Sequence, residues 1–378
     1  MKKPKKLRVT FRKNRSKRTR IDDWTQRFEE HGFEEESEIS VERIGGKSEL
    51  SRRRTVIGEW VESGEEYGFT ILPESSSGVV LFGRVLCVHG ASSVVQTDDG
   101  RIFQSVTRRI LKTMSTEQRQ PVVTGDRVLI RPVVGVVSGV NEAMIERVEP
   151  RHGSISRESK HRKHVIVTNV DQILIVASAD QPVFKPNLID RLLLTAEQTG
   201  VKPIICINKI DLINKTELQP IIGVYSQMGY KVILLSAETG FGMERLRQQL
   251  INRESVVTGQ SGVGKSSLLN MIDPALNLRV ADLGSTQKGQ HTTTTAALHQ
   301  LSFGGFVVDT PGLREFMLWD IIPEEVFGLF RDLRPYENRC RFPDCTHSHE
   351  DDCAVKNAVA EGRLDLRRYE SYLTIRYK

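Results

Sequence analysis

A phosphate-binding loop stands after a base-reading tetrapeptide in this chain, and the usual order of these two motifs is the reverse. The loop, Gly-Gln-Ser-Gly-Val-Gly-Lys-Ser, occupies residues 259–266, and the tetrapeptide Asn-Lys-Ile-Asp occupies residues 208–211. Such a loop holds phosphates on backbone N–H groups at a helix N-terminus, so it needs a strand before it and a helix after it. The apolar run 255–257 and the helix-like stretch 267–272 meet that need. The sequence therefore predicts an α/β domain around this loop.

The loop residues have predicted tasks toward a nucleotide. The ammonium of Lys265 reaches the β and γ phosphates, which also makes it a candidate catalytic group, and the hydroxyl of Ser266 binds Mg²⁺. The predicted phosphate-binding residues are Gly259, Gln260, Ser261, Gly262, Val263, Gly264, Lys265, Ser266 and Ser267.

The tetrapeptide indicates guanine as the base. A carboxylate at Asp211 can accept from the N1 and N2 protons of guanine, a pattern that adenine does not present. Ser236 and Ala237 follow the apolar run 232–235 and suit the backbone contact with guanine O6 that accompanies such a site. A lone tetrapeptide is a weak signal, but together with the loop it favours GTP over ATP. The predicted base-binding residues are Asn208, Lys209, Asp211, Ser236 and Ala237.

Two further segments predict the parts that respond to the γ-phosphate. Asp309-Thr310-Pro311-Gly312 follows the apolar run 306–308, as expected for a metal-bridging Asp309 and a phosphate-sensing Gly312. The threonines at 292–295 lie where a first-switch Thr completes Mg²⁺ coordination. Thr292 and Thr293 are the candidates, and an ordinary polar loop is the competing interpretation.

The residue that orients the attacking water does not stand at its usual position. Many GTPases place a Gln directly after the Asp-x-x-Gly glycine, but this chain has Leu313 there. His291 is the nearest candidate, because an imidazole with a pKa of about 6.5 can orient water or accept its proton. The alternative is an exposed loop histidine.

Four residues near the C-terminus predict one structural Zn²⁺ per chain. Three thiolates and one imidazole suit a closed tetrahedral zinc site. Their spacing departs from paired Cys-x-x-Cys motifs, so reduced cysteines without metal are the alternative. His349 competes for the histidine position, whereas Cys87 and Cys206 lie in apolar runs typical of core residues. The candidate ligands are Cys340, Cys345, His347 and Cys353.

Charge and cysteine content indicate which partners the chain binds and in which cellular compartment it works. The first 20 of the 378 residues hold eleven Lys and Arg and no acid, so without them the net charge of +6 becomes −5. This arm is predicted to seek polyanions such as RNA, with a solvated terminus as the alternative. Five cysteines without an export signal indicate a reducing cytoplasm. No apolar span is long enough to cross a membrane, and nothing demands more than a monomer.

Composition changes along the chain predict four regions. Residues 1–77 are expected to be a basic arm and a low-order extension, and residues 78–150 an OB-like β-barrel made of short β-branched runs. OB barrels often bind RNA, although this one could simply pack on its neighbour. Residues 151–322 alternate strand-like and helix-like runs, which predicts a parallel sheet with helices on both faces. Residues 323–378 form a zinc-binding, mainly helical subdomain.

The predicted sheet strands and helices can be given by residue range. The strands are 172–177, 203–207, 231–235, 255–257 and 305–308, and the helices are 187–199, 217–228, 243–252 and 267–272. At the end of the chain, residues 363–378 interleave basic and tyrosine side chains, among them Arg363, Arg367, Arg368, Arg376 and Tyr372. This stretch is expected either to press on RNA or to pack as a helix with a solvated basic side.

The order base reader, Ser-Ala, phosphate loop, switch Thr, Asp-x-x-Gly is a circular permutation of the usual GTPase order. In this order, and in its Cys, Cys, His, Cys pattern, the chain resembles the RsgA (YjeQ/YloQ) family of circularly permuted bacterial GTPases. The resemblance covers about residue 79 to the C-terminus and leaves the first 77 residues unexplained. It implies a circularly permuted P-loop GTPase domain between the barrel and the zinc module, and it points to His291 in hydrolysis.

The same resemblance implies Mg²⁺-dependent GTP hydrolysis on the small (30S) ribosomal subunit and its rRNA, in late maturation, with hydrolysis releasing the protein from the particle. A second hypothesis is a nucleotide-gated RNA-binding checkpoint with little intrinsic catalysis, which Leu313 favours. A third is an RNA-binding assembly protein with a degenerate site. The intact Lys265, Ser266, Asp309 and Asn208 argue against the third.

Overall fold

The chain falls into two units, seen in a computed structural model. One unit holds residues 1–78 and 108–117, and the other holds residues 79–107 and 118–378. The structure describes residues 79–107, 121–133, 141–158, 163–278, 296–309 and 322–377, and the strands at 5–10, 53–63 and 66–71. Within these residues no helix is long and apolar enough to span a bilayer.

The first unit contains a sheet that the sequence did not lead us to expect. Strands β1 (Lys5–Thr10), β2 (Arg53–Ser63) and β3 (Glu66–Ile71) pair antiparallel in the order β1-β2-β3. Strand β2 reads Arg-Arg-Thr-Val-Ile-Gly-Glu-Trp-Val-Glu-Ser, rich in the β-branched and aromatic residues that strands prefer. The charge runs around it obscured that signal, so the prediction of a low-order extension left these strands out.

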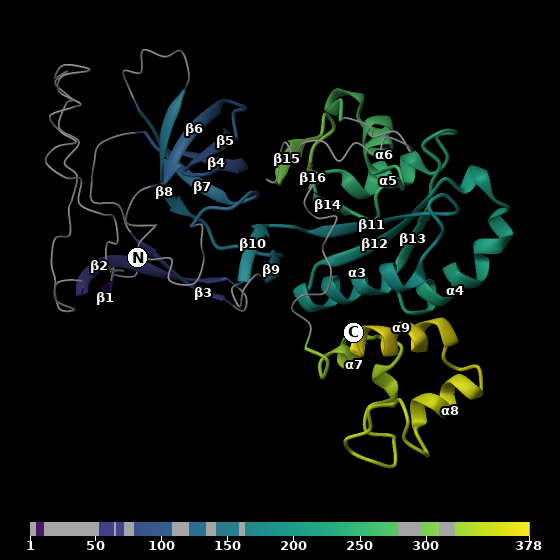
Figure 1. The fold of residues 1–378 in the computed structure, drawn as a ribbon. Coiled ribbons are helices and arrows are strands. Elements are labelled where there is room, and N and C mark those ends of the chain that lie inside the picture. Colours follow the sequence, from purple (N-terminus) through teal and green to yellow (C-terminus); the bar gives the residue numbers. More distant parts are fainter. Residues whose placement is uncertain are drawn as a thin grey trace, which may run out of the picture. The chain divides into compact units, whose positions relative to one another are not determined.

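A five-stranded closed barrel opens the second unit (Figure 1). Its order, β4-β5-β6-β8-β7, has one parallel pair, β6 with β8, as an OB-like topology requires. Alternate residues of β5 and β6 point inward, and Val85, Val95, Val128 and Ile145 are completely buried. The predicted barrel is confirmed. Its strands are β4 (Leu81–His89), β5 (Ser92–Thr97), β6 (Ile102–Thr107), β7 (Arg127–Pro132) and β8 (Glu142–Val148).

A six-stranded sheet in the order β13-β12-β11-β14-β16-β15 follows the barrel. The five predicted strands pair in parallel. The residues of the central strands β11, β12 and β14 are almost wholly buried, as expected for a sheet covered on both faces. The sequence did not predict β15 (Ala297–Gln300), which pairs antiparallel with β16 and makes the sheet mixed. The parallel strands are β11 (Gln172–Ser178), β12 (Lys202–Asn208), β13 (Lys231–Leu234), β14 (Glu254–Thr258) and β16 (Phe306–Asp309).

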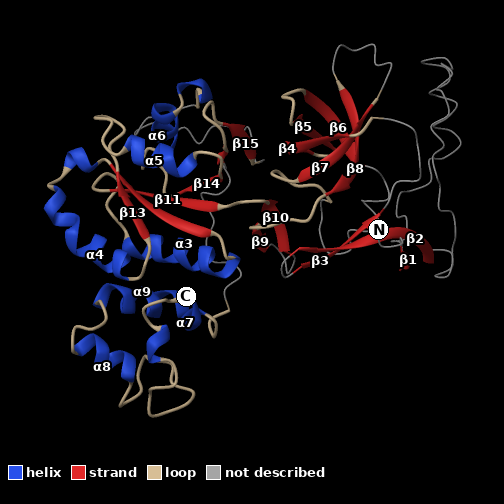
Figure 2. Cartoon of the chain, turned by 180° about the vertical axis from the view of Figure 1, so that it is seen from behind, coloured by secondary structure: helices blue, strands red, loops and turns tan. Residues whose placement is uncertain are grey.

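Helices cover both faces of this sheet, as predicted. Helices α3 (Pro186–Thr199) and α4 (Gln219–Gln227) bury their apolar residues in one core cluster. Helices α5 (Met243–Leu250) and α6 (Lys265–Ile272) contribute to the cluster on the other face. Figure 2 shows the two pairs on opposite sides of the strands. A short antiparallel hairpin, β9 (Ile155–Glu158) with β10 (Lys163–Val167), precedes the sheet.

The C-terminal module is mainly helical and has its own core. Phe330, Leu333, Val355 and Tyr372 are completely buried within it. In both views helix α9 lies along helix α3 of the central domain (Figures 1 and 2), and the two helices are in contact. The module contains α7 (Val326–Leu329), a short 3-10 turn (Arg334–Tyr336), α8 (Ala354–Ala360) and α9 (Leu366–Arg376).

A buried ion cluster joins α9 to α3. The guanidinium of Arg368 lies 2.5 Å from Asp190 and 2.9 Å from Asp332, and the Tyr225 hydroxyl donates to Asp190 over 2.9 Å. Burial raises the pKa of Asp190, and the positive charge of Arg368 opposes that rise.

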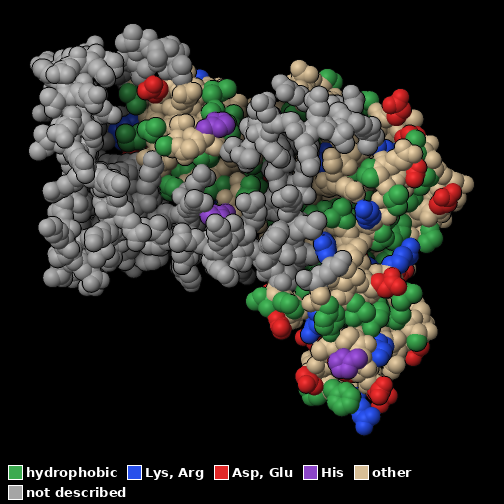
Figure 3. Space-filling model, viewed as in Figure 1, with side chains coloured by type: hydrophobic (Ala, Val, Ile, Leu, Met, Phe, Trp, Pro, Cys, Tyr) green, Lys and Arg blue, Asp and Glu red, His purple; other side chains and the backbone are tan. Residues whose placement is uncertain are grey.

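The expectation that the basic and tyrosine side chains of this helix press on RNA is wrong for Arg368 and Tyr372, because both side chains are buried. Arg367 pairs with Asp365, and Arg363 pairs with Glu361. Figure 3 shows acidic and basic side chains interspersed on the visible face of this module. The packed-helix alternative therefore describes α9 better.

Candidate functional site

The predicted nucleotide motifs meet at one edge of the sheet. Strand β12 ends at Asn208, β14 ends one residue before Gly259, and β16 ends at Asp309. Ser236 lies two residues after the end of β13. Because these strands are parallel, their carboxyl ends lie side by side, which is where doubly wound sheets bind ligands.

The phosphate loop has the backbone conformation that its glycines allow. Gly259, Gly262 and Gly264 have φ angles of 143°, 79° and 90°, and helix α6 begins at Lys265 directly after them. A Cβ atom on Gly259 would lie 2.0 Å from the carbonyl oxygen of Val176. The Lys265 ammonium folds back over the loop and donates to the carbonyls of Gly259 and Gln260, both at 2.8 Å. The cation thus lies on the loop that is predicted to receive phosphates.

The Asn208 side chain links the base-reading tetrapeptide, the Ser-Ala pair and the phosphate loop, which are far apart in the sequence. Its side chain is buried, with 1% of the residue exposed. The amide Nδ2 donates to the Val263 carbonyl of the phosphate loop over 2.8 Å, and the amide Oδ1 accepts from the Ala237 N–H over 3.2 Å. Since both ends of the side chain are engaged with protein, Asn208 holds the base-reading and phosphate-binding segments together.

The remaining base-reading residues lie around this clasp. Lys209 adopts a left-handed φ of 63° and donates from Nζ to the carbonyls of Gly262 at 2.9 Å and Gln181 at 2.6 Å. Asp211 is exposed and accepts from the Ser236 hydroxyl through Oδ1. Its carboxylate therefore faces solvent where a guanine is expected. The backbone of Gln181 is a partner that sequence reasoning missed, because a carbonyl leaves no residue-type signal.

The structure describes only some of the residues predicted to bind Mg²⁺ or to act in catalysis. Ser266 and Ser267 occupy the first turn of α6, beside Lys265. Asp309 is the last residue of β16, and its side chain is not described. The other predicted residues of this set, His291, Thr292, Thr293 and Gly312, lie outside the described residues, as does Leu313. Their assignments stay predictions.

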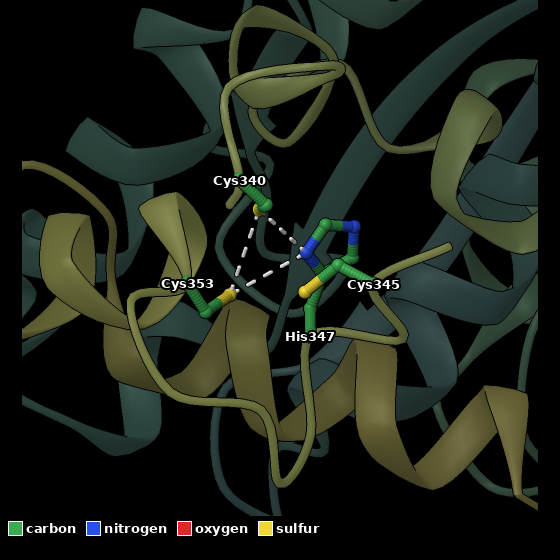
Figure 4. Close-up of side chains that lie close together, drawn as sticks. All are labelled: Cys340, Cys345, His347 and Cys353. Atoms are coloured by element: carbon green, nitrogen blue, oxygen red, sulfur yellow. Dashed lines mark hydrogen bonds between the residues drawn. The ribbon is translucent and has the colours of Figure 1, made fainter. Parts of the chain in front are cut away.

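The four predicted zinc ligands converge in the C-terminal module, and Figure 4 shows their side chains pointing toward one another. One donor atom of each residue lies within 4.8 Å of those of the other three. The Sγ atoms of Cys340 and Cys353 are 3.8 Å apart, and the His347 Nδ1 atom lies 3.4 Å and 3.5 Å from them. His349 is not part of this cluster, and its side chain is mostly exposed.

These separations fit a tetrahedral zinc site. With Zn–S bonds of about 2.3 Å and Zn–N bonds of about 2.0–2.1 Å, a tetrahedron has S···S edges of about 3.8 Å and S···N edges of about 3.5 Å. Burial lowers the pKa of His347, which favours the neutral imidazole that a metal needs. Burial also raises the pKa of the Cys345 thiol to about 12, so a cation is required to hold it as a thiolate.

Surrounding groups hold His347 in place. Its ring stacks on Phe327 with 4.4 Å between the ring centroids, and its carbonyl accepts from the Tyr369 hydroxyl over 2.7 Å. Glu350 accepts from the backbone N–H groups of Thr346 and Ser348, on either side of the histidine.

Away from this cluster, Cys206 is fully buried as predicted, whereas Cys87 is half-buried and lies 3.3 Å from Nε2 of His89.

Comparison with known proteins agrees with this geometry. Residues 148–319 match the family model described as RsgA GTPase. A small ribosomal subunit biogenesis GTPase RsgA from Shewanella oneidensis is 38% identical over 309 residues, which is 80% of this chain and 84% of that protein. The protein of the same name from Chlorobaculum parvum is 40% identical over 304 residues, covering 78% and 97% of the two chains.

Two solved structures share the fold. YjeQ from Thermotoga maritima superposes with a TM-score of 0.63 at 33% identity, covering 79% of this chain and 98% of that one. YloQ, described as a circularly permuted GTPase, gives a TM-score of 0.59 at 28% identity, covering 79% and 94%.

Proposed function

This chain belongs to the RsgA family of small ribosomal subunit biogenesis GTPases, and we propose that it hydrolyses GTP at the sheet edge while bound to the small ribosomal subunit. The observation that carries the proposal is the clasp made by Asn208, which joins the guanine-reading segment to the phosphate loop. We infer that hydrolysis releases the protein from the particle late in maturation. We also propose that the protein is a monomer in the cytoplasm.

The described residues support distinct roles in nucleotide binding. Asp211 presents an exposed carboxylate to N1 and N2 of guanine, and Ala237 offers its backbone near O6. Lys265 exchanges its loop carbonyls for the β and γ phosphates, and the amides of residues 259–267 surround those phosphates. Mg²⁺ bound with GTP would neutralise phosphate charge, and Ser266 supplies a hydroxyl for it. Asp309, Gly312, Thr292 and Thr293 complete the proposed switch elements.

Zn²⁺ is the proposed resident of the Cys340, Cys345, His347 and Cys353 cluster, where four protein ligands leave no open position for catalysis. The metal then has a structural role, since the module's own core is small. We propose residues 78–150, 151–322 and 323–378 as the barrel, the permuted GTPase domain and the zinc module.

The test is turnover of GTP and ATP, each measured alone and with purified small or large ribosomal subunits. We expect GTP turnover only, slow without a partner and strongly stimulated by the small subunit. Stimulation by the large subunit alone would contradict the partner, and equal use of ATP would contradict the base reader. Tight GTP binding without stimulated turnover would favour a checkpoint protein.

His291 is the proposed water-orienting residue. His291→Ala is expected to lower the stimulated rate while the affinity for GDP stays within about twofold, because the P-loop and base reader bind GDP without it. An unchanged stimulated rate would remove His291 from the mechanism.

A further inference from the structure

Two segments carry the base-reading residues, and a contact between a cation and an aromatic ring joins them. The segment between β12 and α4, residues 209–218, carries Asp211, and the loop between β13 and α5 covers residues 235–242. The Lys215 ammonium of the first segment lies 3.9 Å from the centroid of the Phe241 ring in the second. Neither of these two residues belongs to the motifs that predict the guanine site.

The loop after β13 holds Phe241 in a fixed place. Its carbonyl accepts from the Ser236 N–H over 3.1 Å. Gly242 has a φ of 76°, and a Cβ atom there would lie 2.2 Å from the carbonyl oxygen of Leu234, so the loop closes tightly on the end of β13. The Ser236 hydroxyl in turn donates to the Asp211 carboxylate. The residue that carries the ring is therefore bonded to the residue that contacts the base-reading carboxylate.

The other partner of the contact also has a fixed backbone. Lys215 begins a short 3-10 turn (Lys215–Leu218). The side chain of Asn214 caps this turn by accepting from the Thr216 N–H over 3.2 Å. At the end of the turn Leu218 is buried, with 5% of the residue exposed. The ammonium group therefore reaches the ring from a well-defined position.

The two segments are thus joined on both sides of the base reader. The Ser236 hydroxyl joins them at Asp211, and Lys215 joins them at Phe241. An exposed cation–π contact of this kind changes an equilibrium constant by about two- to fivefold. Because Asp211 is exposed, its distance from a bound base depends on the two segments staying together.

We propose that Lys215 and Phe241 are positioning residues for guanine specificity, and that their contact keeps Asp211 where it meets both N1 and N2 of the base. The proposal rests on the proposed function and adds two residues to its guanine site. Inosine diphosphate has the N1 proton but lacks the 2-amino group, so it cannot form the N2 contact. A displaced Asp211 is therefore expected to weaken GDP binding more than binding of inosine diphosphate.

The experiment compares Phe241→Leu and Lys215→Met, singly and together, with Phe241→Tyr, which keeps the ring. The matched control is Arg247→Met. Arg247 lies 4.5 Å from the centroid of the Phe303 ring, in the turn that precedes β16 at the sheet edge away from the site. The measurements are the Kd values of GDP, inosine diphosphate and ADP, by competition with a fluorescent GDP, and the melting temperature.

We expect Phe241→Leu and Lys215→Met each to lower the preference for GDP over inosine diphosphate about two- to fivefold. The double variant loses no more than either single variant, because both remove the same contact. Phe241→Tyr and Arg247→Met keep the wild-type preference. Both partners are exposed, Phe241 by 45%, so we expect the melting temperatures to stay close to that of the wild type.

An unchanged preference in Phe241→Leu, equal weakening of both nucleotides in that variant, or additive losses in the double variant would overturn the proposal. If Phe241→Leu fails to fold, Lys215→Met decides alone, and an unchanged preference there overturns it. A wild-type protein that binds ADP as tightly as GDP would instead refute the proposed function.

Discussion

Replacing Gly264 by alanine tests whether a change in the phosphate loop alters the base-reading residues 208–211. A Cβ atom on Gly264 would lie 2.5 Å from Nδ2 of Asn208, closer than two such atoms can approach. Asn208 must then move, and its 2.8 Å bond to the Val263 carbonyl and its 3.2 Å bond from the Ala237 N–H are lost or weakened. The added methyl group thus reaches the guanine site without touching guanine.

The size of the effect follows from two separate costs. Gly264 has a φ of 90°, and a left-handed conformation costs a residue with a side chain about 1–2 kcal/mol of folding stability. Leaving the buried amide of Asn208 without its partners costs about 1–3 kcal/mol more. If the second cost is expressed in nucleotide binding, the Kd for GDP and for GTP rises by about 5- to 150-fold.

The assay is the Kd of fluorescent GDP and GTP analogues, with Gly200→Ala as the matched control. Gly200 caps α3 with a φ of 68°, and its Cβ would meet nothing within 4 Å. The control carries the backbone strain alone, so we expect it to lose stability and keep nucleotide affinity.

Asn208→Ala provides a second comparison, because it removes the atom that the new methyl group would strike. Gly264→Ala should then add little to the loss already caused by Asn208→Ala. Independent, additive losses of affinity in the double variant, or wild-type affinity in Gly264→Ala, would refute the reasoning.

Two further predictions concern the C-terminal module. Chelation of zinc, or Cys353→Ser, is expected to unfold this module and lower the melting temperature. Circular dichroism measures the melting temperature, and a chromogenic chelator titrates the released zinc. An unchanged melting temperature after complete zinc loss would contradict a structural metal. Arg368→Met is expected to destabilise the fold by about 3–5 kcal/mol, because it strips the buried Asp190 of its cation. Arg367→Met is its control, because Arg367 is exposed and its partner Asp365 is partly exposed.

The stability of Arg368→Met should also depend on pH. Burial raises the pKa of Asp190 above its unfolded value, and without Arg368 nothing cationic opposes that rise within the pair. The folded state then binds the proton more tightly, so the variant is most stable at acidic pH and loses stability as pH rises through the folded pKa. Urea unfolding at pH 5 and pH 8 measures this, and a destabilisation that is the same at both pH values would contradict it.

The sequence predicted the features that depend on residues close together in the chain. The five parallel strands show as apolar runs, and the phosphate loop and the Cys, Cys, His, Cys set are recognised by residue type. Strand β15 escaped because it has only four residues and alternates weakly after a polar run. Arg368 was misread because its partner Asp190 lies 178 residues away, and no sequence window contains both charges.

The permuted order gains a physical meaning from the contacts at the ends of the two predicted switches. The first predicted switch leads to Ala296, which a barrel hydroxyl holds. The second leads to the segment from residue 322, where Arg331 and Arg334 pair with Glu197 of α3 at 2.7 and 3.1 Å. Permutation ends the predicted GTPase domain soon after the second predicted switch, so the C-terminal module follows that switch directly in the chain. We expect a change at the γ-phosphate to reach the C-terminal module through the short stretch of chain between Asp309 and residue 322, whereas the barrel meets the end of the first predicted switch only through the hydrogen bond to Ala296.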